Sequence, residues 1–235
     1  RTCWLAGGLF ARGTGRKELI GNNMKAFNRK KHWENIYRTR ELKDVSWFQP
    51  TPETSLSYFE AFEVPTTARI IDVGGGDSLL ADHLLERGYS NITVLDISAE
   101  AINRARKRLG HRANRVKWIV ADAANFTPSD TYDFWHDRAA FHFLTDPGDI
   151  AGYLDSVRQG LNPDGILVIG TFSVNGPEKC SGIRVMQYSG QSMARLLEPD
   201  FEKIRCETLD HRTPSGSMQN FVFCSFRRKA HRNSQ

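Results

Sequence analysis

The chain has 235 residues, of which 40% are hydrophobic and 25% are charged. These values are typical of a globular α/β domain, and no run approaches the ~18 apolar residues that a membrane-spanning helix requires. The formal net charge of +5 raises the question of a nucleic-acid partner.

The excess positive charge is terminal. Residues 1–23 and the tail from Arg227 onward hold eight of the 32 Lys and Arg residues but only one of the 27 acidic residues. The body of the chain is therefore close to neutral. A nucleic-acid-binding protein is expected to place its basic residues on a folded face, with stacking aromatics among them. Nucleic acid is disfavoured as a partner, although basic tails can still bind phosphate. We expect a monomer or a weak dimer.

The ends of the chain are expected to lie outside the folded domain. Residues 1–23 show no sustained periodicity and precede Met24, which indicates a vector-derived or processed leader, with a transit-peptide remnant as the alternative. A single domain is expected over residues 24–228, with covering helices at 24–64, a core at 65–228 and a basic tail at 229–235.

The cysteines favour a reducing compartment. Cys3, Cys180, Cys206 and Cys224 form no CxxC pair and show no disulfide spacing, so we expect free thiols and a cytoplasmic location, with mitochondrial import as the alternative. The histidines form no HExxH or carboxylate cluster, and no metal is expected.

The predicted elements begin with two helices and continue as alternating strands and helices. Asn28 can cap the first helix, and Ser98 can cap a later one. Apolar patterning predicts strands at 69–73, 92–96, 116–121, 132–137 and 165–172, helices at 79–87, 98–109, 148–161 and 191–197, and a closing hairpin formed by residues 201–214 and 218–228. This order predicts a doubly wound α/β fold: a mostly parallel, Rossmann-like sheet of seven strands with an antiparallel last strand.

Three consecutive glycines, Gly74, Gly75 and Gly76, follow the first predicted strand and precede a helix. Ligands of open parallel sheets bind beyond the carboxyl ends of the strands, where bare backbone amides can approach them closely. A nucleoside triphosphate would need Gly-Lys-Ser/Thr, which is absent, and a dinucleotide would need glycine where Leu79 stands. S-adenosylmethionine, whose loop is acid-x-G-x-G, fits Asp72 to Gly76.

Two further carboxylates follow the next two strands. Asp96 ends the second strand, where it can accept hydrogen bonds from both ribose hydroxyls. Asp122 and Ala123 follow the third strand, where a carboxylate and a backbone amide can contact adenine. Alternatively, Asp122 is an ordinary loop residue.

With these residues in place, the chain resembles the class I, seven-strand S-adenosylmethionine-dependent methyltransferases. The resemblance rests on "IIDVGGGDS", "LDIS", "VADAANF", "YDFWHDRAAFHFL" and "LNPDGILVIGTF", which occur in the family's order. It implies S-adenosylmethionine as cofactor, S-adenosylhomocysteine as product, and Ile97 beside Asp96 as part of the cofactor site. Ser78 replaces the family's frequent third glycine.

The expected acceptor site lies beyond the fourth strand, at "FWHDRAAFHFL". Asp137 can hold or deprotonate an amine, and His136 can do so near neutral pH. Alternatively, His136 is a structural strand residue. Arg138 either pairs with Asp137 or binds an acidic substrate. The segment Phe141–Phe143 is core or site.

The segment "HWENIYRTRELKDVSWFQ" is similar to the N-terminal cover of a subset of these enzymes that includes eukaryotic protein-lysine methyltransferases. The resemblance implies that Trp47 and Gln49 close the methionine end of the cofactor site, with Trp33 and Tyr37 packing the lid. The subset's Gly-Thr pair after the strand-four acid and base is Ala139-Ala140 here.

The expected function is transfer of a methyl group to a protein lysine amine or a small molecule. Two alternatives are a catalytically inactive methyltransferase-like binding module and a nicotinamide-dependent oxidoreductase. An intact Asp72, Asp96 and Asp122 argues against the first, and Leu79 with the closing hairpin argues against the second.

Overall fold

The central element of the protein is a seven-stranded sheet. The computed structural model describes residues 27–230. The expected leader at 1–23 and most of the expected basic tail at 229–235 therefore lie outside the described residues. The strands follow the order β3-β2-β1-β4-β5-β9-β8, in which β9 and β8 are antiparallel to their neighbours. Their bounds are Arg69–Val73 (β1), Asn91–Asp96 (β2), Val116–Val120 (β3), Tyr132–Arg138 (β4), Leu161–Phe172 (β5), Phe201–Arg212 (β8) and Met218–Arg228 (β9). The predicted fold class is confirmed.

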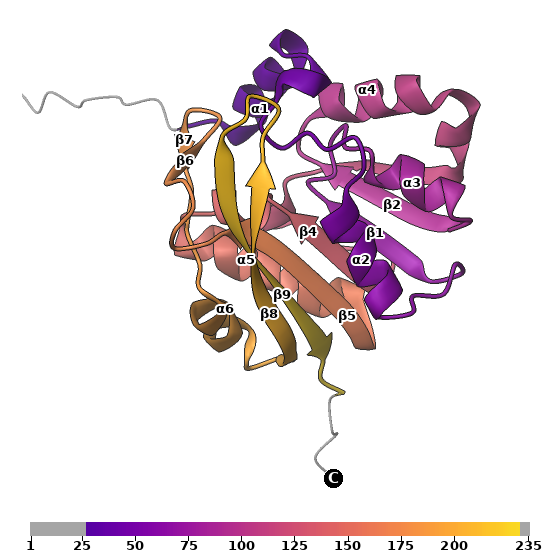
Figure 1. Ribbon diagram of the computed structural model, residues 1–235. Coiled ribbons are helices and arrows are strands. Elements are labelled where there is room, and N and C mark those ends of the chain that lie inside the picture. Colours follow the sequence, from indigo (N-terminus) through magenta and orange to yellow (C-terminus); the bar gives the residue numbers. More distant parts are fainter. Residues whose placement is uncertain (1–26, 231–235) are drawn as a thin grey trace, which may run out of the picture.

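Helices cover both faces of this sheet (Figure 1). Those on the first face share one hydrophobic cluster, and those on the second share another. The first face carries α2 (Glu53–Ala61), α3 (Leu80–Glu86) and α4 (Ala99–Leu109), and the second carries α5 (Pro147–Gly160) and α6 (Gly190–Leu197). Helix α1 (Arg29–Thr39) contacts α4. The short 3₁₀ helices are Leu42–Asp44, Gly110–Arg115, Ala123–Asn125 and Phe141–Phe143.

Side chains fix where several helices begin. Asn28 Oδ1 accepts a hydrogen bond from Lys31 N at 2.8 Å, and Ser98 Oγ accepts one from Ala101 N at 3.2 Å. Asp146 caps α5 in the same way, through Gly148 N at 2.8 Å. Each cap satisfies an amide that has no partner within its helix. Both predicted caps, Asn28 and Ser98, are confirmed.

A small two-stranded ribbon, β6 (Lys179–Cys180) and β7 (Ile183–Arg184), was not predicted from the sequence. Each strand has only two residues, too few to show an alternating apolar pattern. The ribbon, the tip of the β8–β9 hairpin and α1 gather at one end of the molecule (Figure 1).

The prediction that the cysteines are free thiols is wrong for two of them. Cys206 on β8 and Cys224 on β9 form a disulfide, with their Cα atoms 4.1 Å apart. The two residues are direct partners in the antiparallel register, because both lie nine positions from Ser215 in the turn. A hairpin places such equidistant residues opposite one another, and this symmetry was the signal in the sequence. Cys180 is buried and forms no disulfide within residues 27–230.

Within residues 27–230, no helix has the length and apolar character needed to cross a lipid bilayer.

Candidate active site

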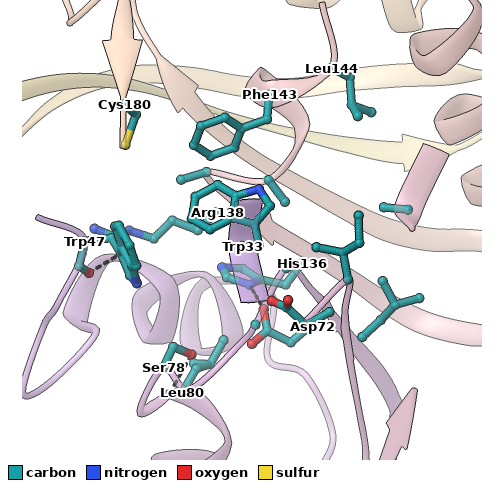
Figure 2. A pocket seen from close by; sticks show the side chains of 18 of the residues that line it. Trp33, Trp47, Asp72, Ser78, Leu80, His136, Arg138, Phe143, Leu144 and Cys180 are labelled. Carbon is teal, nitrogen blue, oxygen red and sulfur yellow. Dashed lines mark hydrogen bonds and ion pairs between the residues drawn. The ribbon is translucent and has the colours of Figure 1, made fainter. Parts of the chain in front are cut away.

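A cavity lies beyond the carboxyl ends of β1, β2 and β4, where the sequence predicts ligand binding (Figure 2). Residues from every part of the fold line it. They include Arg29, Trp33, Tyr37, Ser46, Trp47, Ser55, Asp72, Gly74, Gly75, Asp96, Ile97, Asp122, Ala123, His136, Arg138, Phe143, Phe172, Cys180, Gln219 and Phe221. Three predicted site residues are not among those that line the cavity: Gly76, Asp137 and Gln49.

The glycine loop fits a ligand that approaches the backbone. Gly74 and Gly76 have φ angles of +67° and +51°, a region that other L-residues rarely adopt. A Cβ atom on Gly75 would lie 2.5 Å from Asp72 Oδ2. The amides of Gly74 and Gly75 donate to the carbonyl oxygen of Leu95, which anchors the loop on the end of β2.

Asp96 presents a buried carboxylate beside this loop. Its Oδ1 accepts a hydrogen bond from Ser98 N at 2.8 Å, whereas Oδ2 accepts none from residues 27–230 and faces Gly76. Burial, together with the nearby carboxylates of Asp77 and Asp72, raises the pKa of Asp96 to about 7, although the hydrogen bond from the Ser98 amide opposes this. A buried acceptor of this kind fits a ligand that supplies hydroxyl donors.

Asp122 lies at the other end of the cofactor side and is already engaged. Its Oδ2 accepts a hydrogen bond from Arg29 at 2.9 Å, and its Oδ1 accepts one from Ala124 N at 3.1 Å. Arg29 also donates to Asp149 at 2.7 Å, so this arginine ties the start of α1 to the loop after β3 and to α5. A carboxylate oxygen has two lone pairs, and Asp122 retains the capacity to accept a further donor.

Aromatic side chains from the N-terminal segment cover the cavity. The rings of Trp33 and Trp47 meet edge to face at 5.9 Å, and Tyr37 packs against both. This packing of Trp33 and Tyr37 agrees with the prediction. Gln49 does not line the cavity, and its Oε1 is buried with no hydrogen-bond partner among the described residues.

His136 links two other cavity residues. Asp72 and His136 are partners in the register of β1 and β4, and His136 Nδ1 lies 2.7 Å from Asp72 Oδ1. The other ring nitrogen, Nε2, lies 3.0 Å from Ser55 Oγ on α2. Because a carboxylate only accepts, Nδ1 carries a hydrogen, and in the neutral ring Nε2 accepts from the serine hydroxyl. The three side chains form a continuous hydrogen-bonded chain (Figure 2 draws the His136–Asp72 pair).

Asp137 points to the opposite face of the sheet, so the structure contradicts its predicted catalytic role. Successive side chains of a strand alternate between faces, and His136 occupies the cavity side. The Asp137 carboxylate accepts hydrogen bonds from Ala140 N (3.0 Å), Phe141 N (3.1 Å) and Tyr153 Oη (2.8 Å). Burial raises its pKa to about 6, although these donors oppose the shift. Asp137 fixes the loop after β4.

We expect Asp137→Ala to lower the free energy of unfolding by about 2–4 kcal/mol, because three donors, two of them in buried hydrogen bonds, lose their acceptor. Urea unfolding followed by fluorescence measures this change. Tyr153→Phe removes only one of the three hydrogen bonds and is the matched control, with a smaller expected loss. A stable Asp137→Ala variant with impaired methyl transfer would return Asp137 to the list of catalytic candidates.

Arg138 points into the cavity from the same face as His136. One terminal nitrogen donates to the Trp47 carbonyl oxygen at 3.0 Å (Figure 2), and the guanidinium carbon lies 5.4 Å from the centre of the Phe221 ring. Burial lowers the pKa of Arg138 to about 10, and the charge of Asp72 partly opposes this. The expected alternative of a pair with Asp137 is wrong, because the two side chains lie on opposite faces.

The C-terminal part of the chain completes the wall around Arg138. Phe172 at the end of β5, Gln219 and Phe221 on β9, and Cys180 on β6 all line the cavity. Sequence reasoning missed them, and also Ser55 and Arg29, because each comes from an element far away in the chain. The available signal was that β5 follows the fourth strand and that the closing hairpin continues the same sheet.

Comparisons with known proteins agree with this geometry. Residues 70–165 match the family model described as a methyltransferase domain. They contain the glycine loop, Asp96, Asp122 and His136. The predicted methyltransferase family, with S-adenosylmethionine as its cofactor, agrees with this match.

The names of the relatives give different methyl acceptors. A malonyl-[acyl-carrier protein] O-methyltransferase of Ilyobacter polytropus is 29% identical over 104 residues, which cover 44% of this chain and 39% of that protein. The EEF1A lysine methyltransferase 2 of Danio rerio is 24% identical over 192 residues, covering 75% of this chain and 76% of the relative. The chain thus spans about two fifths of the first relative and three quarters of the second.

A solved structure shares the fold. The 1,6-didemethyltoxoflavin-N1-methyltransferase of Burkholderia thailandensis, with bound 1,6-didemethyltoxoflavin and S-adenosylhomocysteine, superimposes with a TM-score of 0.65 at 18% identity. The match covers 86% of this chain and 87% of that one.

Proposed function

We propose that this protein transfers the methyl group of S-adenosylmethionine to a small-molecule acceptor bound at the Arg138 end of the cavity. The observation that carries the proposal is one continuous cavity that joins the glycine loop and Asp96 to a wall of Arg138, Phe172 and Phe221. The bound cofactor supplies a methyl group already activated on a sulfonium sulfur, so the protein mainly has to orient two reactants.

The cofactor-side residues suit the parts of this cofactor. Asp96 accepts the ribose hydroxyls, while the bare backbone of Gly74 and Gly75 lets the ligand approach closely, with Ile97 alongside. Asp122 and Ala123 hold the adenine end, and Trp47 covers the methionine end. This orientation of the cofactor is supported by Asp96 Oδ2, which lies beside Gly76 and accepts no hydrogen bond from residues 27–230. Gln49 is no longer included in this set.

His136 is the residue best placed to take a proton from the acceptor. Its Nε2 lies 3.0 Å from Ser55 Oγ and both residues line the cavity, while Asp72 holds the ring through Nδ1. An acceptor O–H or N–H that replaces or joins the Ser55 hydroxyl would donate to Nε2. Asp72 then acts as a positioning residue that stabilises the imidazolium.

The charges of the acceptor end favour a small molecule over a lysine side chain. A lysine ammonium needs a carboxylate or a ring of carbonyl oxygens, yet the cation Arg138 lies here, Asp137 faces away and Asp72 is bound to His136. Protein lysine stays the second candidate, because relatives named EEF1A lysine methyltransferase 2 cover most of the domain.

Labelled transfer distinguishes the two acceptors. The protein is incubated with methyl-tritiated S-adenosylmethionine and a cell extract, and the products are separated by size. We expect label in the small-molecule fraction, dependent on the protein. Label that is confined to a protein band and released as methyllysine on hydrolysis would establish the second candidate instead.

A further inference from the structure

The Arg138 guanidinium has unused donors that reach the cavity. Only the hydrogen bond to the Trp47 carbonyl is made within residues 27–230, and no described carboxylate oxygen lies within 4.0 Å of the guanidinium nitrogens. Arg138 has five N–H donors, so one edge of the fork is left for a ligand. No Arg138 nitrogen is among the fully buried polar atoms that lack a hydrogen-bond partner. The unpaired N–H groups of the guanidinium therefore face the cavity that Arg138 lines.

The groups around Arg138 do not neutralise it. The nearest opposing charge, on Asp72, is taken up by the hydrogen bond to His136. Burial and the positive charge of Arg138 lower the pKa values of His142 and His211. The pKa of His142 falls to about 3. Both rings are therefore neutral at physiological pH. The acceptor end carries one uncompensated positive charge.

The shape of this subsite also restricts its ligand. Phe143, Phe172 and Phe221 form aromatic walls, with the Gln219 side chain among them. Aromatic walls around one guanidinium suit a flat apolar body that carries a planar anion, because a carboxylate matches two parallel N–H donors of arginine. A phosphate would use the same donors without the planar match.

We propose that Arg138 determines acceptor specificity by binding a carboxylate on the methyl acceptor. This inference rests on the proposed function, since it assigns a substrate class to the same cavity. The methionine moiety of the cofactor also has a carboxylate, and the test separates these two sources. Arg138 lies two residues beyond His136 on the same face of β4, so the Cα atoms of these two residues are about 7 Å apart along the strand.

Benzoate and its neutral isostere benzamide serve as probes. Each is titrated into the protein saturated with S-adenosylhomocysteine, and binding is followed by fluorescence of Trp33 and Trp47, which line the cavity. We expect saturable quenching by benzoate and at least about tenfold weaker binding of benzamide, the usual scale for losing a charge-assisted hydrogen bond. Equal binding of the two probes, or no binding of benzoate at tens of millimolar, would overturn the proposal.

Variants assign the effect to the residue. Arg138→Gln is expected to bind benzoate and benzamide equally, while Arg112→Gln, which removes only an exposed ion pair with Glu86, keeps the wild-type preference. Cofactor binding is compared with S-adenosylhomocysteine and with 5′-methylthioadenosine, which lacks the amino-acid carboxylate. Arg138→Gln should change neither affinity. If it weakens only S-adenosylhomocysteine, Arg138 binds the cofactor and the inference is wrong. Failure of wild-type protein to bind S-adenosylhomocysteine at all contradicts the proposed function itself.

Discussion

Asp96→Asn is expected to weaken binding of S-adenosylhomocysteine by roughly 10- to 100-fold, which corresponds to the loss of about 1–3 kcal/mol from a charged hydrogen-bond acceptor. Asparagine keeps the size of the side chain and an oxygen for the Ser98 amide, so the substitution isolates the charge. Titration calorimetry measures the affinity. Glu100→Gln, on the same loop-to-helix segment, is the control and should bind as wild type.

The same substitution should stabilise the ligand-free protein above neutral pH. Burial raises the pKa of Asp96 in the folded state to about 7, from an ordinary value of 3.8. The folded state then binds more protons than the unfolded state between these values, so the contribution of Asp96 to stability falls as pH rises through this window. Asparagine does not titrate. The midpoint of thermal unfolding of the Asp96→Asn variant at pH 8 should therefore exceed that of the wild-type protein.

Cofactor binding should itself depend on pH. The ionised carboxylate is the form that accepts both ribose hydroxyls, so affinity should rise with pH and level off above about 7. Near pH 7 the complex should release a proton, which calorimetry detects in buffers of different ionisation enthalpy. If the Asp96→Asn variant binds S-adenosylhomocysteine as tightly as the wild-type protein, and its affinity depends on pH in the same way, Asp96 does not hold the ribose.

His136→Asn is expected to reduce methyl transfer by about 10²-fold or more, the usual scale for losing a general base. The Asn amide can still donate to Asp72 in place of Nδ1, but nothing replaces Nε2. Binding of S-adenosylhomocysteine should stay within about twofold, because the lost nitrogen faces Ser55 rather than the glycine loop.

Label incorporation from the tritiated cofactor measures this effect, with Ser55→Ala as the matched variant that leaves the imidazole in place. Ser55→Ala should retain most of the transfer activity. Undiminished transfer by His136→Asn would mean that positioning alone suffices and that the acceptor arrives without a proton to lose. Loss of cofactor binding in this variant would assign His136 a structural role.

The cofactor side of the site could be predicted from the sequence because it is local. Gly74 to Gly76 and Asp96 each follow a strand, and parallel strands end at one edge of the sheet. The alternation of side chains along a strand also separates Asp137 from His136 and Arg138. The apolar residues around them, however, are typical of a strand buried on both faces, so the sequence does not indicate which face borders the cavity.

The acceptor side was less predictable because it is assembled from distant segments. Ser55 comes from α2, Cys180 from a two-residue strand, and Gln219 from the last strand of the chain. Their proximity follows from tertiary packing that no local pattern encodes. The disulfide between Cys206 and Cys224 is different, since the symmetry of the hairpin about Ser215 was present in the sequence.

The central claim is that the glycine loop and Asp96 hold S-adenosylmethionine rather than a nicotinamide or a nucleoside triphosphate. Titration calorimetry of the full chain with S-adenosylhomocysteine, NADH and ATP, under one set of conditions at pH 8, tests it most directly. We predict saturable binding of S-adenosylhomocysteine and at least about 100-fold weaker binding of the other two, a difference of about 3 kcal/mol. NADH binding that equals or exceeds that of S-adenosylhomocysteine would contradict the account.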